Sequence, residues 1–142
     1  ACQFATENAR LNVLEDRVHF QEANAFDLLA EQSRHGEKYD VIILDPPAFT
    51  KTRAAVASAA RGYKEINLRA MKMVREGGYL VTCSCSQHIL PAHFLEIVRD
   101  AARDAHVQLR QVEYRTQGRD HPILPAAPET QYLKCGIFQL LH

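Results

Sequence analysis

Tyr39-Asp40-Val41-Ile42-Ile43-Leu44-Asp45-Pro46-Pro47 is the segment with the clearest structural signal. Residues 39–43 are rich in β-branched and aromatic side chains, and Leu44 completes an uninterrupted apolar run. Such a run is typical of a strand that is buried on both faces, as in a parallel sheet. Each of the two prolines fixes φ and lacks an N–H, so the strand ends at Asp45. We expect this carboxylate at the carboxyl edge of a sheet, where open α/β folds bind ligands.

A second strand, over residues 79–83, leads into the segment Cys83-Ser84-Cys85-Ser86. If the two strands are neighbours in the sheet, their ends bring a carboxylate and a thiol to the same edge of that sheet. We expect Asp45 and Cys85 to converge on a single cavity.

Strand and helix patterns alternate along the chain, which predicts an α/β fold with a mainly parallel sheet and an antiparallel C-terminal strand. Asn24 is a suitable cap for the helix that follows it, and Gly36 is a suitable stop. Residues 116–132 form a long loop between the last two strands. The expected helices cover 4–12, 25–34, 54–74 and 92–105, and the expected strands cover 18–22, 39–44, 79–83, 107–114 and 135–141.

The composition suits one domain with a substantial core, because 46% of the 142 residues are hydrophobic. Seventeen basic and 17 acidic side chains give a net charge of zero, so no global field attracts a polyanion. No segment reaches the length of a membrane span. The four cysteines and seven histidines lack zinc-site spacing, which indicates a reduced, cytoplasmic protein without a structural metal.

Five motifs in order give the chain a family resemblance. It resembles the class I S-adenosylmethionine-dependent ribosomal RNA methyltransferases, and most closely their large-subunit cytosine-5 group. The motifs are Asp45-Pro46-Pro47-Ala48-Phe49, Arg61-Gly62-Tyr63, Thr82-Cys83-Ser84-Cys85-Ser86, Gln117-Gly118-Arg119-Asp120-His121-Pro122 and Tyr132-Leu133-Lys134.

The resemblance implies a Rossmann-like methyltransferase fold, S-adenosyl-L-methionine as cofactor and ribosomal RNA of the 23S type as partner. It also implies that residues 1–142 form an incomplete domain, without the first two strands and the Gly-rich cofactor loop. We then expect strand 18–22 to close the gap by pairing with strand 39–44, or a second copy to pair there as a homodimer.

The resemblance assigns the nucleophile to Cys85, with Cys83 as second choice or support. A thiolate that attacks carbon 6 of cytosine makes carbon 5 nucleophilic enough to accept a methyl group. Without the motif context, both cysteines are equally well explained as small apolar residues at a buried strand end.

The Asp-Pro-Pro loop is expected to bind the substrate base. Asp45 would protonate or hydrogen-bond the N3 edge of cytosine, and Pro46 and Pro47 would shape the pocket. Phe49 would stack on the flipped base, and Lys51 would contact phosphate. The alternatives are a turn carboxylate at Asp45, a core aromatic at Phe49 and a solvated charge at Lys51.

The cofactor is expected to contact Asn24, Ala25, Phe26 and Asp45. The family usually has an aspartate at the position of Asn24, bonded to the adenine amine; the Asn24 carbonyl can accept the same bond. A simple helix cap explains Asn24 equally well.

Two further functions stay open at this stage. One is a related methyltransferase acting on a guanine or adenine nitrogen, which needs no thiol. The other is a catalytically inactive RNA-binding or assembly module.

Overall fold

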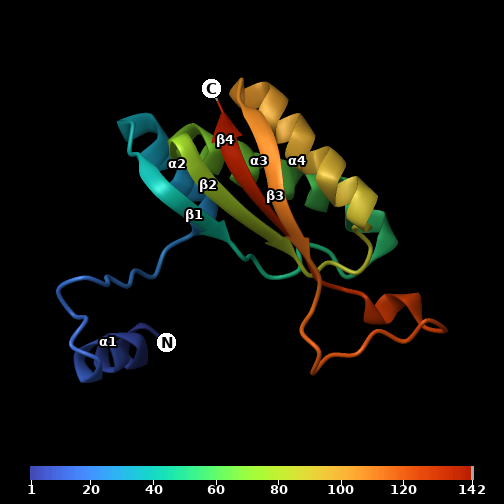
Figure 1. The fold of residues 1–142 in the computed structure, drawn as a ribbon, viewed down its shortest axis with the longest axis horizontal. Helices are drawn as coiled ribbons and strands as arrows, with labels where there is room; N and C mark the ends of the chain where they lie inside the picture. Colours follow the sequence, from blue (N-terminus) through green and yellow to red (C-terminus); the bar gives the residue numbers. More distant parts are fainter. Residues whose placement is uncertain (142) are drawn as a thin grey trace.

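The computed structural model describes residues 1–141, except for the side chain of Pro128. Four strands form one sheet in the order β1-β2-β4-β3 (Figure 1). The helices are α1 (Cys2–Leu11), α2 (Ala25–His35), α3 (Val56–Met73) and α4 (Pro91–Ala105), with short 3-10 helices at Arg53–Ala55 and Pro128–Thr130. The strands are β1 (Tyr39–Leu44), β2 (Val74–Ser84), β3 (Gln108–Arg115) and β4 (Lys134–Leu141).

The sheet is mixed. β1 and β2 are parallel and are joined through α3, whereas β4 runs antiparallel to both β2 and β3. The α/β class and the antiparallel C-terminal strand are therefore confirmed. The expectation of a mainly parallel sheet was wrong for the described residues, because β4 inserts between β2 and β3 and makes both of its pairings antiparallel.

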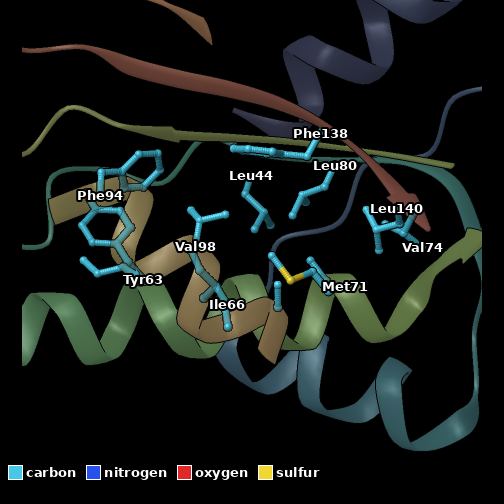
Figure 2. Packing of buried hydrophobic residues seen from close by; sticks show 14 of the residues in the cluster. Leu44, Tyr63, Ile66, Met71, Val74, Leu80, Phe94, Val98, Phe138 and Leu140 are labelled. Carbon is cyan, nitrogen blue, oxygen red and sulfur yellow. The ribbon is translucent and has the colours of Figure 1, made fainter. Parts of the chain in front are cut away.

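Helices cover one face of the sheet and leave the other face open (Figure 1). The core lies between that covered face and helices α3 and α4, as Figure 2 shows. Leu80 and Phe138 point inward from the sheet, and Tyr63 and Phe94 meet them from the helices. The inward positions of β4 alternate with half-exposed ones, which is the period of a strand with one covered face.

Local signals set the helix ends as expected. The Asn24 side chain accepts a hydrogen bond from the Phe26 N–H at 3.0 Å, and α2 begins at Ala25, directly after Asn24. Gly36 follows α2 with φ 74°, a left-handed conformation that a glycine adopts without strain. Pro91 is the first residue of α4, where its missing N–H costs nothing.

Strand β1 has the predicted limits but not the predicted burial on both faces. Leu44 is 8% exposed and belongs to the core, whereas Val41 and Ile43 are 52% and 67% exposed. Leu44 points to one face of the sheet, and Val41 and Ile43 point to the other. Among residues 1–141, helices cover only the first of these faces.

Residues 18–22 form no strand, so the expected pairing of this segment with β1 was wrong. The segment is exposed and runs from α1 to α2, and α1 lies apart from the sheet (Figure 1). Within the described chain no strand pairs with the outer edge of β1. Pairing of a second copy at that edge stays a prediction.

Strand β2 starts five residues earlier than expected. Val74 pairs with Tyr39, and the next pair joins Tyr79 to Val41, so β2 carries extra residues opposite Asp40. Gly77 adopts φ 75° within this irregularity, which allows the strand to leave and rejoin its register.

Candidate active site

Asp45 and the Cys83–Ser86 segment lie at the ends of two adjacent parallel strands. Leu44, the last residue of β1, pairs with Thr82 of β2. Asp45 follows Leu44 directly and is exposed. The predicted meeting of the two motifs at one edge of the sheet is therefore present in the fold.

A cleft of about 520 Å³ lies beside this edge, between the Asp-Pro-Pro loop and the start of α2. It brings the predicted cofactor residues together with Asp45, Pro46 and Pro47. Its walls are mostly apolar, with one amide and one carboxylate. The lining residues are Asn24, Ala25, Phe26, Leu29, Ile43, Leu44, Asp45, Pro46, Pro47, Phe49 and Ile66.

Asn24 caps α2 and also lines the cleft. The capping bond uses one lone pair of the Oδ1 atom, and an amide oxygen has two. The helix-cap interpretation is thus observed, and it leaves an acceptor for a ligand amine.

Cys85 lies next to the Asp-Pro-Pro loop but is not among the residues that line the cleft. Its Sγ atom is 4.0 Å from the Pro46 carbonyl oxygen, at the limit for a thiol hydrogen bond. The thiol is half-buried. The expected single cavity shared by Asp45 and Cys85 is therefore not what the cleft shows: the carboxylate lies in it, and the thiol lies against the neighbouring peptide.

Cys83 is the less reactive of the two cysteines. Burial, followed by the thiol of Cys135 on β4 and the charge of Asp45, raises the pKa of Cys83 to about 12. A thiol with that pKa stays protonated near neutral pH, and only the thiolate is a good nucleophile. Between the two candidates, this chemistry favours Cys85.

Phe49 packs against protein side chains. Its ring centroid is 4.5 Å from that of Tyr63 and 5.7 Å from that of Phe26, and a Cβ on Gly62 would lie 3.2 Å from the ring. The core-aromatic alternative thus accounts for these contacts, and base stacking stays a prediction. Lys51 is exposed in the loop, and its phosphate contact also stays a prediction.

A buried polar group behind Cys85 was missed by the sequence analysis. Lys134 is 2% exposed, and its Nζ atom donates to the carbonyl oxygens of Ser86 at 2.7 Å and Tyr132 at 2.8 Å. The Tyr63 hydroxyl lies 2.8 Å from the Ser86 hydroxyl. One signal was available: Lys134 is in phase with the inward positions Gly136 and Phe138.

The long loop contributes little to the site as described. His121 and Asp120 form an exposed pair at 3.1 Å, and the Gln117 side chain donates to the Thr130 carbonyl. In residues 1–141, no group of three or more acidic, histidine or cysteine side chains is arranged to hold a metal ion. None of the helices described combines the length and apolar character needed to cross a bilayer.

No protein-family model matches the sequence. The chain is 41% identical over 135 residues to ribosomal RNA large subunit methyltransferase I of Erwinia tasmaniensis, and 44% identical over 135 residues to the protein of the same name from Aeromonas salmonicida. Each match covers 94% of this chain and 34% of the relative. The chain therefore spans about a third of the length of these relatives.

Solved structures give the fold independently. The methyltransferase SMU.776, crystallised with SAH, matches 82% of this chain and 30% of its own with a TM-score of 0.69 at 19% identity. NSun6 from Pyrococcus horikoshii, solved with SFG, matches 96% and 38% with a TM-score of 0.65 at 20% identity. This chain has the methyltransferase fold. In such α/β folds, ligands generally bind at the carboxyl ends of the parallel strands, which is where the cleft beside Asp45 lies.

Proposed function

We propose that the protein is an S-adenosylmethionine-dependent methyltransferase acting on large-subunit ribosomal RNA, with cytosine carbon 5 as its target and Cys85 as its nucleophile. The observation that carries this proposal is the contact between the Cys85 thiol and the Asp-Pro-Pro loop at adjacent strand ends. The identity to the two relatives named above supports the substrate class.

The cleft beside Asp45 fits the adenosine part of S-adenosylmethionine. Its apolar walls suit a planar base and Asn24 offers an amide oxygen to the adenine amine. Asp45, which follows β1, offers a carboxylate to the same cleft. When bound, the cofactor supplies an electrophilic methyl group.

The residues of the chain then have distinct tasks. The Cys85 thiolate forms a bond to carbon 6 of cytosine as the carbon 5–carbon 6 double bond opens. Asp45, which would act as the protonated carboxylic acid, gives a proton or a hydrogen bond to N3 and so neutralises the charge that develops in the ring. Carbon 5 accepts the methyl group as an electron pair leaves with the cofactor sulfur. A base then removes the carbon 5 proton, and the carbon–sulfur bond breaks to return the thiolate.

Ribosomal RNA would reach this site as an extruded base. Lys51 is exposed close to the Asp-Pro-Pro loop and would contact phosphate without reading sequence. Phe49 would stack on the base only through a ring face that does not contact Tyr63, or after its ring had moved away from Tyr63.

The test uses the protein that carries this chain, with a ribosomal RNA substrate in which the target cytosine is replaced by 5-fluorocytosine. Fluorine cannot leave as a proton does, so the covalent adduct persists and is detected on a denaturing gel. We expect an adduct with the unchanged protein and with Cys83→Ala, and none with Cys85→Ala. Adduct formation by Cys85→Ala would contradict the assigned nucleophile.

Mass analysis of the modified nucleoside separates the proposal from its alternatives. A methylated guanine or adenine nitrogen would indicate the related methyltransferase that needs no thiol. RNA binding without any methyl transfer would indicate an RNA-binding or assembly module.

A further inference from the structure

A second cleft, of about 420 Å³, lies at the same end of the sheet as the cleft beside Asp45 and shares no lining residue with it. It is formed by three connections of the chain, which run from β1 to α3, from β2 to α4 and from β3 to β4 (Figure 1). Its polar side chains include Arg53, Gln87, Glu129 and Gln131. The function proposed above gives this second cleft no task.

Cys85 lines neither cleft but is close to both. Its Sγ atom is 4.0 Å from the carbonyl oxygen of Pro46, which lines the first cleft. Gln87, two residues after Cys85, lines the second cleft, and two residues of chain span at most about 7 Å. A base that reacts at Cys85 is covalently joined to its neighbours in the RNA strand. An adjoining nucleotide therefore has to lie along this edge of the sheet.

One buried lysine sets the separation between the two glutamines of the second cleft. The Nζ atom of Lys134 donates to the carbonyl oxygens of Ser86 at 2.7 Å and Tyr132 at 2.8 Å. Gln87 directly follows Ser86, and Gln131 directly precedes Tyr132. Both glutamines are exposed, whereas the lysine that joins their backbones is 2% exposed. The cleft thus presents two amide groups on backbone that is fixed from the core side.

The lining has the chemistry that single-stranded RNA requires. Arg53 is exposed and takes part in none of the ion pairs among residues 1–141, so its guanidinium group is available to a phosphate. The amides of Gln87 and Gln131 can each donate and accept, as the hydrogen-bonding edge of a base requires. Glu129 adds an acceptor for an amine or a ribose hydroxyl, and Ile89 adds apolar surface.

We propose that the second cleft binds the nucleotide next to the target base in single-stranded RNA. Arg53 contacts its phosphate, and Gln87 and Gln131 hydrogen-bond the edge of its base and so select that base. The inference rests on the proposed function for its RNA substrate. It adds a source of sequence preference, which a phosphate contact at Lys51 does not provide.

The first experiment measures how tightly the protein that carries this chain binds a ribosomal RNA fragment containing the nucleotide it methylates, at several salt concentrations. Arg53→Gln removes one positive charge and keeps a polar side chain. We expect weaker binding and a slope of log K against log salt that is smaller by about 0.7, the value for one phosphate contact in a single strand. Arg99→Gln is the matched control, because Arg99 is exposed on α4 and does not line the second cleft. It should leave the slope unchanged.

The second experiment tests base selection. The nucleotides on either side of the target are replaced, one at a time, by each of the other three. We expect the unchanged protein to prefer one base at one of these positions by about fivefold or more in Kd, as a good amide–base contact provides. The double variant Gln87→Ala, Gln131→Ala should reduce this preference to less than about twofold. Gln108→Ala, which changes an exposed glutamine of β3, should retain it.

The affinity for S-adenosylmethionine separates the two clefts. It should be the same in Arg53→Gln as in the unchanged protein, and a loss would assign the second cleft to the cofactor and overturn the inference. An unchanged salt slope in Arg53→Gln, or a base preference that survives in the double variant, would also overturn it. Failure of the proposed function has a different signature: an adduct formed by Cys85→Ala would refute the nucleophile and leave the slope and the base preference as expected. A protein that neither binds nor methylates ribosomal RNA would refute both.

Discussion

The hydroxyl groups of Tyr63 and Ser86 lie 2.8 Å apart in the core, and this contact ties helix α3 to the residue that follows Cys85. Both side chains are fully buried. A buried hydroxyl pair of this kind is directional, so it fixes the strand end relative to the helix as well as filling space. The segment that carries the candidate nucleophile is thus held from two sides, by Tyr63 and by Lys134.

Replacing Tyr63 by phenylalanine should lower the free energy of unfolding by about 1–2 kcal/mol, because the ring is kept and the Ser86 hydroxyl loses its partner. Urea denaturation followed by circular dichroism measures this. Tyr79→Phe is the matched control, since Tyr79 is 38% exposed and the same change should have almost no effect there. Equal effects at both positions would mean that the Tyr63–Ser86 bond contributes nothing.

Truncation of two neighbouring residues of β1 should destabilise the chain by very different amounts. Leu44→Ala removes a core side chain and should destabilise the chain by about 2–4 kcal/mol. Ile43→Ala changes a side chain that is 67% exposed and should cost less than about 1 kcal/mol. Denaturation of the two variants in parallel checks this. A large loss in Ile43→Ala would indicate that the open face of the sheet is covered in solution.

The stability contributed by Cys83 should depend on pH above pH 9. Its folded-state pKa of about 12 lies above the ordinary value of 9.0, so the folded chain retains the proton that the unfolded chain loses. This contribution is fully present below pH 9 and is lost as pH rises toward 12. We expect the advantage of the unchanged chain over Cys83→Ala to shrink across that interval. Cys2→Ala provides the comparison, and a difference independent of pH would contradict the shifted pKa.

Gly136→Ala should destabilise the chain by about 1–3 kcal/mol. An added Cβ would clash with the ring of Phe138, which is buried and packed in the core. Gly118→Ala is a suitable control, because there the nearest atom is a carboxylate oxygen of the exposed Asp120. Thermal unfolding of both variants gives the comparison, and a stable Gly136→Ala chain would mean that the Phe138 ring has room to shift.

The helix ends and the limits of β1 could be predicted because their causes are local. Asn24 and Gly36 bracket α2 through contacts within a few residues, and the two prolines after Asp45 stop β1 whatever lies around them. The sequence also predicts that Leu44 and Ile43 point to opposite faces of the sheet, because side chains alternate along a strand. It does not show whether helices cover one face or both, and this is why burial on both faces was wrongly expected.

The candidate site was predicted in part for the same reason. The motifs placed Asp45 and Cys85 at adjacent strand ends, but their relation to one cleft depends on how the Asp-Pro-Pro loop turns, and Cys85 proved to lie outside its lining. The absence of a strand at residues 18–22 also depends on long-range pairing: an apolar pattern does not form a strand unless the segment pairs with another strand, and this segment does not pair with the free edge of β1.

Sequence alone determined where α2 begins and ends, where β1 ends and which residue types stand at the edge of the sheet, because caps and prolines act over a few peptide bonds. Tertiary structure decided that Lys134 is buried beside Ser86, that Cys83 faces Cys135, and that β1 presents one open face. The first two outcomes depend on the pairing of β4 with β2, and the third depends on the helices covering a single face of the sheet. A charge becomes buried only once such distant segments have come together.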